Sequence, residues 1–215
     1  SGLQNWIPYY ESTIDENGWD TTVYSSQISE SFPIRVADNM YIKNGYKHVI
    51  FDSIIKSPFQ DKTYHYSGLG FYLFKELTEN INNSSFDNYL YDKIYNPLHL
   101  NYLRFNPRNY FKLEKIIPTE DDTIFRKQLL HGDVHDQGAA MLGGVSGNAG
   151  LFGNAYNVAV LMQMFVNGGS YGNQKIFEQK TIDFFNSCHF IADSNRRGLG
   201  FDKPLLVYEE HRTNC

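Results

Sequence analysis

The chain has 215 residues, a net charge of −5 and no run of five or more basic residues. Its length suffices for one domain with a real core, and its charge argues against nucleic-acid binding. Hydrophobic residues make up 41% of the chain, as in ordinary soluble proteins, and no apolar run is long enough to span a bilayer. Because the chain begins with Ser1, the lack of a targeting segment carries no information about location.

The aromatic share is high, at 16% of the residues. Most of these side chains are expected in the core or singly on the surface, although tyrosines also suit a carbohydrate or peptide cleft.

Hydrophobic periodicity and turn residues predict a mostly helical chain. Residues 1–45 are expected to be irregular, with turns at 16–18 and 43–45, and residues 100–130 form an excursion of little periodicity. Strand signal is concentrated near the C-terminus. The predicted helices are 48–56, 67–81, 86–95, 139–141, 155–167 and 179–186, and the predicted strands are 199–201 and 205–208.

The clearest helix runs from Ser67 to Ile81. Its apolar residues follow the stripe of an amphipathic helix, Ser67 is placed to cap the first turn, and the Asn-rich stretch 82–84 ends it. Further along, Asp136 is expected to cap the short helix that starts near Ala139.

Neither cysteines nor histidines predict a metal site or a disulfide. Cys188 and Cys215 lack the spacing of either, so free thiols are expected. His131, Asp133 and His135 would share one face of an extended segment, a plausible ligand set beside Asp136. The favoured interpretation is that Asp136 is a helix cap and the histidines are loop residues.

Two internal motifs resemble those of serine nucleophiles, and both are weak. Ser53-Ile54-Ile55-Lys56 is a literal Ser-x-x-Lys, a pattern expected about once by chance in a chain this rich in Ser and Lys. Residues 144–148 nearly spell the Gly-x-Ser-x-Gly elbow, but Asn148 replaces the last glycine and no apolar strand leads in. A glycine-rich turn packed against another backbone is the favoured interpretation of this second motif.

Three blocks in order carry a family resemblance: Tyr66-Ser67-Gly68-Leu69-Gly70-Phe71-Tyr72-Leu73, Val134-His135-Asp136 and the stretch 142–152. Together they resemble the serine β-lactamase and penicillin-binding-protein superfamily, in its class C-like esterase and peptidase branch. The resemblance implies an α+β, β-lactamase/transpeptidase-like fold and a metal-independent enzyme without a cofactor.

In that family a Ser-x-x-Lys motif supplies the nucleophile, a Tyr-x-Asn motif a phenol, and a Lys/His-Thr-Gly strand closes the site. A serine hydroxyl is a poor nucleophile at neutral pH and needs such a base beside it. The resemblance implies that Tyr66 is the catalytic phenol and that Ser67 and Gly68 lie at substrate-binding positions. Gly68 departs from the family's Asn or Asp, which puts hydrolysis of an amide-like substrate in doubt.

The ends of the chain resemble internal segments of the family. Ser1 to Pro8 resembles a stretch downstream of the nucleophile, and Gly198-Leu199-Gly200-Phe201 resembles the strand before the His-Thr-Gly strand. Only nine residues separate Lys56 from Tyr66, too few for Ser53 to be the family's nucleophile. The chain is therefore expected to be one partial domain, with a helical lobe over about 1–190 and the first sheet strands over about 198–215.

The leading interpretation is a fragment of a serine hydrolase that acts on an ester, a D-amino-acid peptide or a β-lactam, inactive alone because its nucleophile is missing. The alternative is a non-catalytic module that binds cell-wall peptide or glycan, favoured by Gly68; a purely structural helical domain is a further possibility. The resemblance implies a periplasmic or cell-surface location and a small-molecule or peptide substrate. Loss of the sheet would expose an apolar face through which the chain could self-associate.

Overall fold

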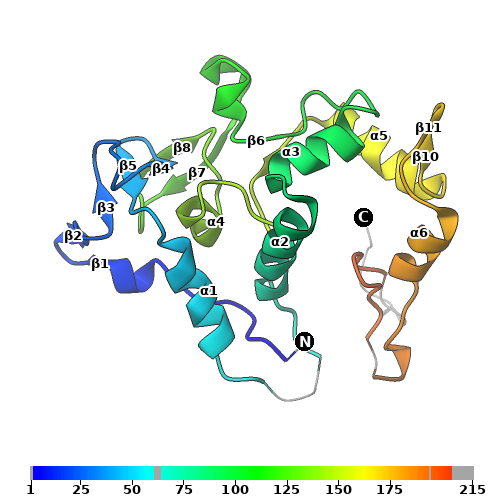
Figure 1. Cartoon of the computed structure of the whole chain (residues 1–215), viewed down its shortest axis with the longest axis horizontal. Coiled ribbons are helices and arrows are strands. Elements are labelled where there is room, and N and C mark those ends of the chain that lie inside the picture. The colour runs from blue at the N-terminus through cyan, green and yellow to red at the C-terminus, as the bar shows by residue number, and fades with distance from the viewer. Residues whose placement is uncertain (1, 61–63, 194, 205–215) are drawn as a thin grey trace, which may run out of the picture.

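The computed structural model describes residues 2–60, 64–193 and 195–204, and combines short strands with helices in one α+β arrangement (Figure 1). The strands are β1 (Ile14–Asp15), β2 (Gly18–Trp19), β3 (Tyr24–Ser25), β4 (Ile34–Ala37), β5 (Met40–Ile42), β6 (Arg104–Phe105), β7 (Pro118–Asp122), β8 (Gln128–His131), β9 (Leu151–Phe152), β10 (Ser170–Tyr171) and β11 (Gln174–Lys175). The α-helices are α1 (Lys47–Lys56), α2 (Leu69–Asn82), α3 (Phe86–Leu90), α4 (Gln137–Met141), α5 (Ala155–Val166) and α6 (Gln179–Asn186). A π-helical turn, η2 (Tyr91–Tyr95), continues α3, and 3₁₀ turns lie at η1 (Glu11–Thr13), η3 (Pro107–Asn109), η4 (Leu113–Lys115) and η5 (Ile191–Asp193).

The N-terminal region contains β-structure, so the prediction of an irregular stretch over residues 1–45 was wrong. Strands β3, β5 and β4 form an antiparallel sheet in that order, and β1 pairs with β2 across the predicted turn at 16–18. Four of these five strands are only two or three residues long. Such short runs cannot display the alternation from which strands are recognised, because that pattern needs at least four residues.

The predicted excursion over residues 100–130 contains an antiparallel hairpin, β7–β8, in which Pro118 pairs with His131 and Asp122 with Gln128. Its turn places Phe125 and Arg126 inside the protein rather than in solvent. The hairpin also supports α4, which follows β8 after a five-residue connection. The low periodicity of this stretch therefore reflects a turn that is buried, not a disordered loop.

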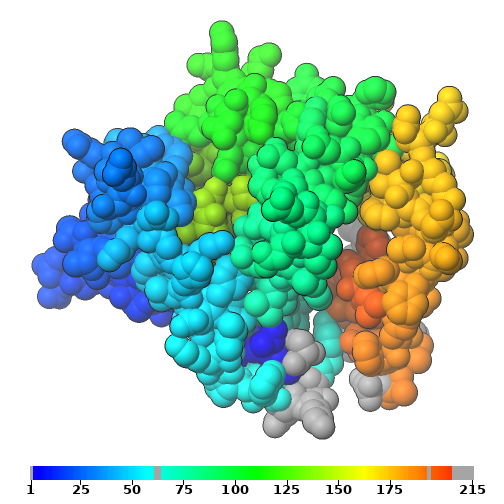
Figure 2. All heavy atoms as spheres, in the orientation of Figure 1, coloured from blue at the N-terminus to red at the C-terminus, as the bar shows by residue number. Residues whose placement is uncertain are grey.

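Two hydrophobic clusters lie along the molecule, from the N-terminal strands at one end to α5 and α6 at the other (Figures 1 and 2). The first joins the β3–β5–β4 sheet to α1, the start of α2, the β7–β8 turn and α4. The second lies between η2, the loop before β6, and α5, with Leu100, Leu103, Val160 and Met164 at its centre. Because α2 contributes to the first cluster and contacts α3, it connects the two halves.

The helix predictions were confirmed, and the bounds of α6 coincide with those predicted. The C-terminus of α2 ends at Asn83 in the left-handed conformation, φ +47°. Its apolar stripe, however, is only partly buried. Leu69 is 1% exposed, whereas Phe74, Leu77 and Ile81 are 61%, 52% and 71% exposed.

The predicted strand over residues 199–201 does not form: Leu199 donates its backbone N–H to Phe185 O, and Gly198 closes a turn onto Phe201 O. The second predicted strand, 205–208, lies outside the described residues. None of the helices described is both long and apolar enough to cross a membrane.

A buried ion pair holds the β7–β8 turn. The Arg126 side chain is fully buried and donates from Nε to Asp122 Oδ2 at 2.6 Å, while its Nη1 and Nη2 donate to the carbonyls of Val134 at 2.6 Å and His135 at 2.5 Å. Asp122 also accepts the N–H groups of residues 124–126. Burial opposes the charged carboxylate, but the hydrogen bond and charge of Arg126 outweigh burial and lower the pKa of Asp122 below its ordinary value.

Asp122→Asn is expected to destabilise the protein by about 3–5 kcal/mol, because it removes the nearest counter-charge of the buried Arg126 guanidinium and leaves only Glu120 Oε2, 3.6 Å from Nη2. Urea unfolding followed by circular dichroism measures the change. Asp121→Asn is the matched control, since Asp121 is exposed on the neighbouring position of the same strand and should cost less than about 0.5 kcal/mol. Equal losses in the two variants would contradict a special role for Asp122.

Candidate functional site

Tyr66, Ser67 and Gly68 lie at the entrance to α2 and are held by the N-terminal segment. Ser67 Oγ donates to Gln4 O at 2.6 Å and accepts the N–H of Leu69 at 3.2 Å. The N-cap of α2 is Gly68, without a side-chain cap, so the prediction of Ser67 as the cap was wrong by one residue. Gly68 N donates to Asn5 O at 3.2 Å. The hydroxyl of Ser67 is thus committed to backbone groups, which fix the triplet in place.

The Tyr66 side chain is 54% exposed and points away from the core. Arg197 lies over its ring, with the guanidinium carbon 5.1 Å from the ring centroid. Arg197 is in turn tied to Asp202 Oδ2 at 2.9 Å. A guanidinium over an aromatic face is a favourable cation–π arrangement, so two residues 131 positions apart in the sequence meet at the candidate phenol.

Gly68 leaves room for the side chain that the family pattern carries at this position. A Cβ on Gly68 would meet no atom within 4 Å. The backbone there, φ −76° and ψ −19°, is accessible to any L-residue. The glycine therefore removes a polar side chain from the triplet without any steric requirement for its absence.

Behind this entrance, a polar network joins α2 to α4. Tyr72 Oη donates to Asp136 Oδ1 at 3.2 Å, and the same carboxylate oxygen caps α4 by accepting the N–H of Ala139 at 2.6 Å, which confirms the predicted cap. Asn148 Nδ2 donates to Tyr72 Oη at 3.4 Å. Burial and the negative charge of Asp136 raise the pKa of Tyr72 above its ordinary value of 10.0, so this phenol stays protonated and acts as a hydrogen-bond donor.

The turn at residues 144–148 packs against α2, as the favoured interpretation predicts. A Cβ on Gly147 would overlap the carbonyl oxygen of Phe71, so the close approach needs glycine here. Ser146 is 2% exposed, and its Oγ donates to Asn148 Oδ1 at 2.6 Å. An amide oxygen cannot accept a proton as a base does, and burial denies Ser146 a substrate.

Ser53 and Lys56 do not form a nucleophile pair. Ser53 Oγ donates back to Val49 O at 2.8 Å in its own helix, while Lys56 Nζ binds Asp52 Oδ2 at 2.8 Å. The literal Ser-x-x-Lys is therefore a solvated stretch of α1, with Ile54 alone of its residues fully buried.

The predicted candidate ligands around residue 133 point to different partners. His131 Nε2 lies 2.5 Å from Ile116 O, His135 Nδ1 lies 3.4 Å from Glu120 Oε2, and Asp136 caps α4. The part of the chain that the structure describes brings no three His, Cys, Asp or Glu together for a metal ion. Cys188 is a free thiol that donates to Arg196 O at 2.9 Å, and Cys215 lies outside the described residues.

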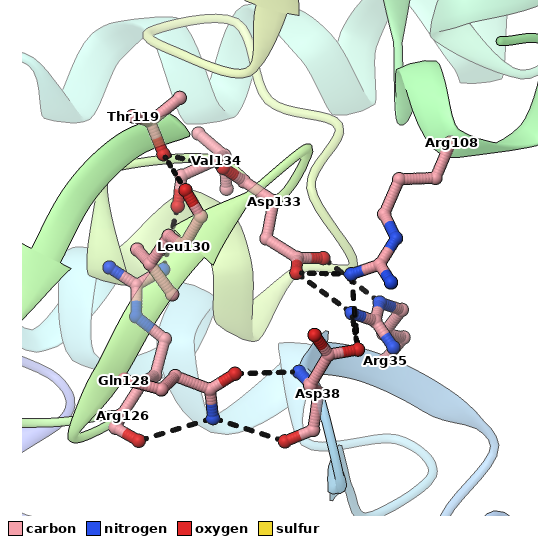
Figure 3. Close-up of polar contacts among 9 residues, drawn as sticks. All are labelled: Arg35, Asp38, Arg108, Thr119, Arg126, Gln128, Leu130, Asp133 and Val134. Atoms are coloured by element: carbon pink, nitrogen blue, oxygen red, sulfur yellow. Dashed lines mark hydrogen bonds and ion pairs between the residues drawn. The ribbon is translucent and has the colours of Figure 1, made fainter. Parts of the chain in front are cut away.

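Sequence reasoning missed two arrangements: Arg197 over Tyr66, and a cluster in which Arg35 and Arg108 share Asp133 (Figure 3). Asp133 was considered only as a metal ligand. Its partners lie 98 and 25 residues away, and no local pattern links residues so far apart.

Comparisons with known proteins relate the chain to bacterial proteins named as an amidase and as carboxypeptidases. No family model matches it. It is 34% identical over 164 residues to an N-acetylmuramyl-L-alanine amidase of Bacillus subtilis strain 168, an alignment covering 70% of this chain and 37% of that protein. It is 38% identical over 170 residues to a protein assigned by name as a D-alanyl-D-alanine carboxypeptidase in Salmonella enteritidis PT4, covering 72% and 39%. The chain thus spans well under half the length of these relatives.

Among solved structures, the D-amino acid amidase of Ochrobactrum anthropi SV3, complexed with L-phenylalanine, matches with a TM-score of 0.50 over 86% of this chain and 43% of that one. Their sequences are 12% identical, so this likeness bears on the fold alone. The fold is that of the β-lactamases and transpeptidases, as the three sequence blocks predict. The chain is a relative of the serine β-lactamase and penicillin-binding-protein superfamily.

Gly147→Ala is expected to destabilise the protein by about 1–3 kcal/mol, because the added methyl group forces the 144–148 turn away from the Phe71 carbonyl. Gly70→Ala is the matched control: it lies in α2 with no atom within 4 Å of the new Cβ, and should stabilise by about 0.5–1 kcal/mol. Thermal and urea unfolding of both variants give the signs. A neutral Gly147→Ala would show that the turn does not pack on α2.

Proposed function

We propose that the chain is the helical-lobe part of a serine hydrolase, whose serine is acylated by an ester, a D-amino-acid peptide or a β-lactam and then released by water. The observation that carries the proposal is the exposed Tyr66 at the entrance to α2, fixed through Ser67 and Gly68 to residues 4–5, in a chain related to named amidases and carboxypeptidases. The catalytic role of Tyr66 and the substrate-binding roles of Ser67 and Gly68 are part of this proposal.

In the proposed reaction the nucleophile and its lysine come from a Ser-x-x-Lys outside these residues. As the serine hydroxyl attacks the carbonyl, the Tyr66 oxygen accepts the serine proton and passes its own phenol proton to the neutral lysine amine. When the leaving group departs, a proton returns from the lysine through Tyr66 to the leaving group. The tetrahedral intermediate is stabilised by an oxyanion hole to which the family's Lys/His-Thr-Gly strand contributes. Both candidate serines within the chain have hydroxyls bonded to acceptors that are not bases, which supports a chain that is inactive alone.

Exposed apolar side chains support the view that this lobe packs on further protein. On α2, Phe71, Phe74, Leu77 and Ile81 are 37–71% exposed, and α6 exposes Phe184 and Phe185. Apolar patches of this kind mark surfaces that are covered in the complete assembly or that associate. We also propose that the chain consists of a helical lobe, about 1–190, and the first part of the sheet region, about 198–215. The isolated chain is proposed to self-associate through its exposed apolar residues.

One observation favours a second candidate function. Gly68 gives the triplet no side-chain amide, although the position has room for one. A lobe that keeps the cleft but lacks the side-chain amide at position 68 is consistent with a non-catalytic module that binds cell-wall peptide or glycan. We place either function in the periplasm or at the cell surface, the location that the family resemblance implies.

The chain alone is expected to form no covalent adduct with a fluorophosphonate probe or a penicillin. Intact-mass spectrometry after incubation measures this, and chymotrypsin treated in parallel confirms that the fluorophosphonate is active. A stoichiometric adduct at Ser53 or Ser146 would place the nucleophile inside the chain and contradict the proposal.

The polypeptide extended by the flanking sequence of its gene is expected to be acylated by the same probes. Tyr66→Phe in that polypeptide should slow acylation by about 10²-fold or more, the usual contribution of a general base. Tyr64→Phe, another exposed tyrosine two residues away, is the control and should leave the rate unchanged. Saturable binding of a D-alanyl-D-alanine peptide without acylation would favour the binding module instead.

A further inference from the structure

A cavity of about 250 Å³ lies between β4, the η3 turn and the glycine pair Gly143–Gly144, away from Tyr66. Neither Tyr66 nor Arg197 lines it, so it is separate from the proposed active site. Its lining residues are Ile34, Arg35, Val36, Asn106, Arg108, Asn109, Gly132, Asp133, Val134, Ala140, Gly143 and Gly144.

Two arginines converge at this cavity on one buried carboxylate (Figure 3). Arg35 donates from Nε to Asp133 Oδ1 at 2.9 Å and from Nη2 to Oδ2 at 2.8 Å, and Arg108 Nη1 donates to the same Oδ2 at 3.1 Å. Asp38 Oδ1 bridges both guanidinium groups from the outer side, at 2.8 and 3.1 Å. The Asp133 side chain is 10% exposed, so the carboxylate that holds both arginines lies largely inside the protein.

The two guanidinium groups have more donors than these carboxylates use. Each guanidinium carries five N–H groups. Within the described ranges, Nη1 of Arg35 and both Nε and Nη2 of Arg108 have no bonding partner. The side chains are 33% and 28% exposed, so a small ligand can reach them. Asn106 and Asn109 add amide groups, of which Asn106 already donates to Gly143 O.

The lining of the cavity also includes four aliphatic residues, Ile34, Val36, Val134 and Ala140. A ligand that suits both these residues and the arginines has an anionic head and a short apolar body. The volume is below the range of about 300–1,000 Å³ typical of drug-sized ligands, which limits the body to a few carbons. Because Asp38 and Asp133 already contribute two negative charges, a monoanion is repelled less than a dianion such as phosphate.

We propose that this cavity binds a short aliphatic carboxylate, whose planar head accepts from the unused guanidinium N–H groups of Arg35 and Arg108 and whose chain contacts Ile34 and Val134. A guanidinium and a carboxylate match as a two-pronged pair, which a spherical anion cannot reproduce. The bound carboxylate would accept hydrogen bonds from the guanidinium N–H groups that Asp38 and Asp133 do not use.

The test uses isothermal titration of the chain with sodium butyrate, with sodium chloride at equal ionic strength and with the neutral isostere butyramide. Saturable binding of butyrate, absent for chloride and butyramide, is the expected result. Asn109→Asp keeps the size of the side chain and adds a negative charge at the cavity, and it should weaken butyrate binding at least 10-fold. Asn80→Asp, at an exposed position of α2 away from the cavity, makes the same change in net charge, and this variant should bind butyrate as the unaltered chain does.

Arg108→Lys keeps the positive charge beside Asp133 but removes the planar fork, and it should also weaken butyrate binding severalfold while the protein stays folded by circular dichroism. Equal heats for butyrate and butyramide would overturn the proposal. So would undiminished binding by the folded Asn109→Asp variant, or saturable binding of inorganic phosphate in place of butyrate. None of these outcomes bears on acylation, because the cavity does not include Tyr66.

Discussion

The candidate site depends on the hydrogen bonds of the Arg126 guanidinium, which is fully buried at the β7–β8 turn. The Arg126 Nε forms an ion pair with Asp122, and its Nη1 and Nη2 donate to the carbonyls of Val134 and His135. The next residue is Asp136, which therefore has a defined position from which it caps α4 and accepts from Tyr72. A buried charge is costly unless every donor is paired, so this turn has one favourable arrangement. Through Tyr72 that arrangement reaches α2 and the residues at its entrance.

Close backbone approaches complete the same connection. Gly147 lets the 144–148 turn lie against the Phe71 carbonyl, and Asn148 on that turn donates to Tyr72. The helix that presents Tyr66 is therefore braced on one side by a polar network and on another by a glycine contact. The N-terminal segment closes the arrangement through Gln4 and Asn5. A phenol proposed for proton transfer benefits from such bracing, because its distance to the reacting group must be held within a fraction of an ångström.

The buried and the surface polar clusters differ in whether their hydrogen-bond donors are all used within the protein. The Arg126 pair and the Tyr72 network are enclosed, and their hydrogen bonds are used within the protein. The Arg35–Asp133–Arg108 cluster reaches the surface and keeps donors without partners within the described ranges. Burial opposes the charge of Arg35, yet its hydrogen bonds to Asp133 and Asp38 raise its pKa above the ordinary value, so it remains a cation. The buried Arg126 stabilises the β7–β8 turn, whereas Arg35 and Arg108 line the cavity proposed to bind a carboxylate.

By itself, the sequence determined the helices, the Asp136 cap and the glycine turn at 147, because each rests on residues within a few positions of one another. It also indicated the superfamily, through three separate blocks that occur in the family's order. It did not predict the N-terminal sheet or the β7–β8 hairpin, whose strands of two to five residues are stabilised by pairing rather than by their own periodicity. The structure showed that the Ser53 and Ser146 hydroxyls bond to non-basic acceptors two to four residues away. Only the tertiary structure decided that Arg197 covers Tyr66 and that Arg35 meets Asp133. Contacts across about a hundred residues depend on how the whole chain packs, and no local pattern records them.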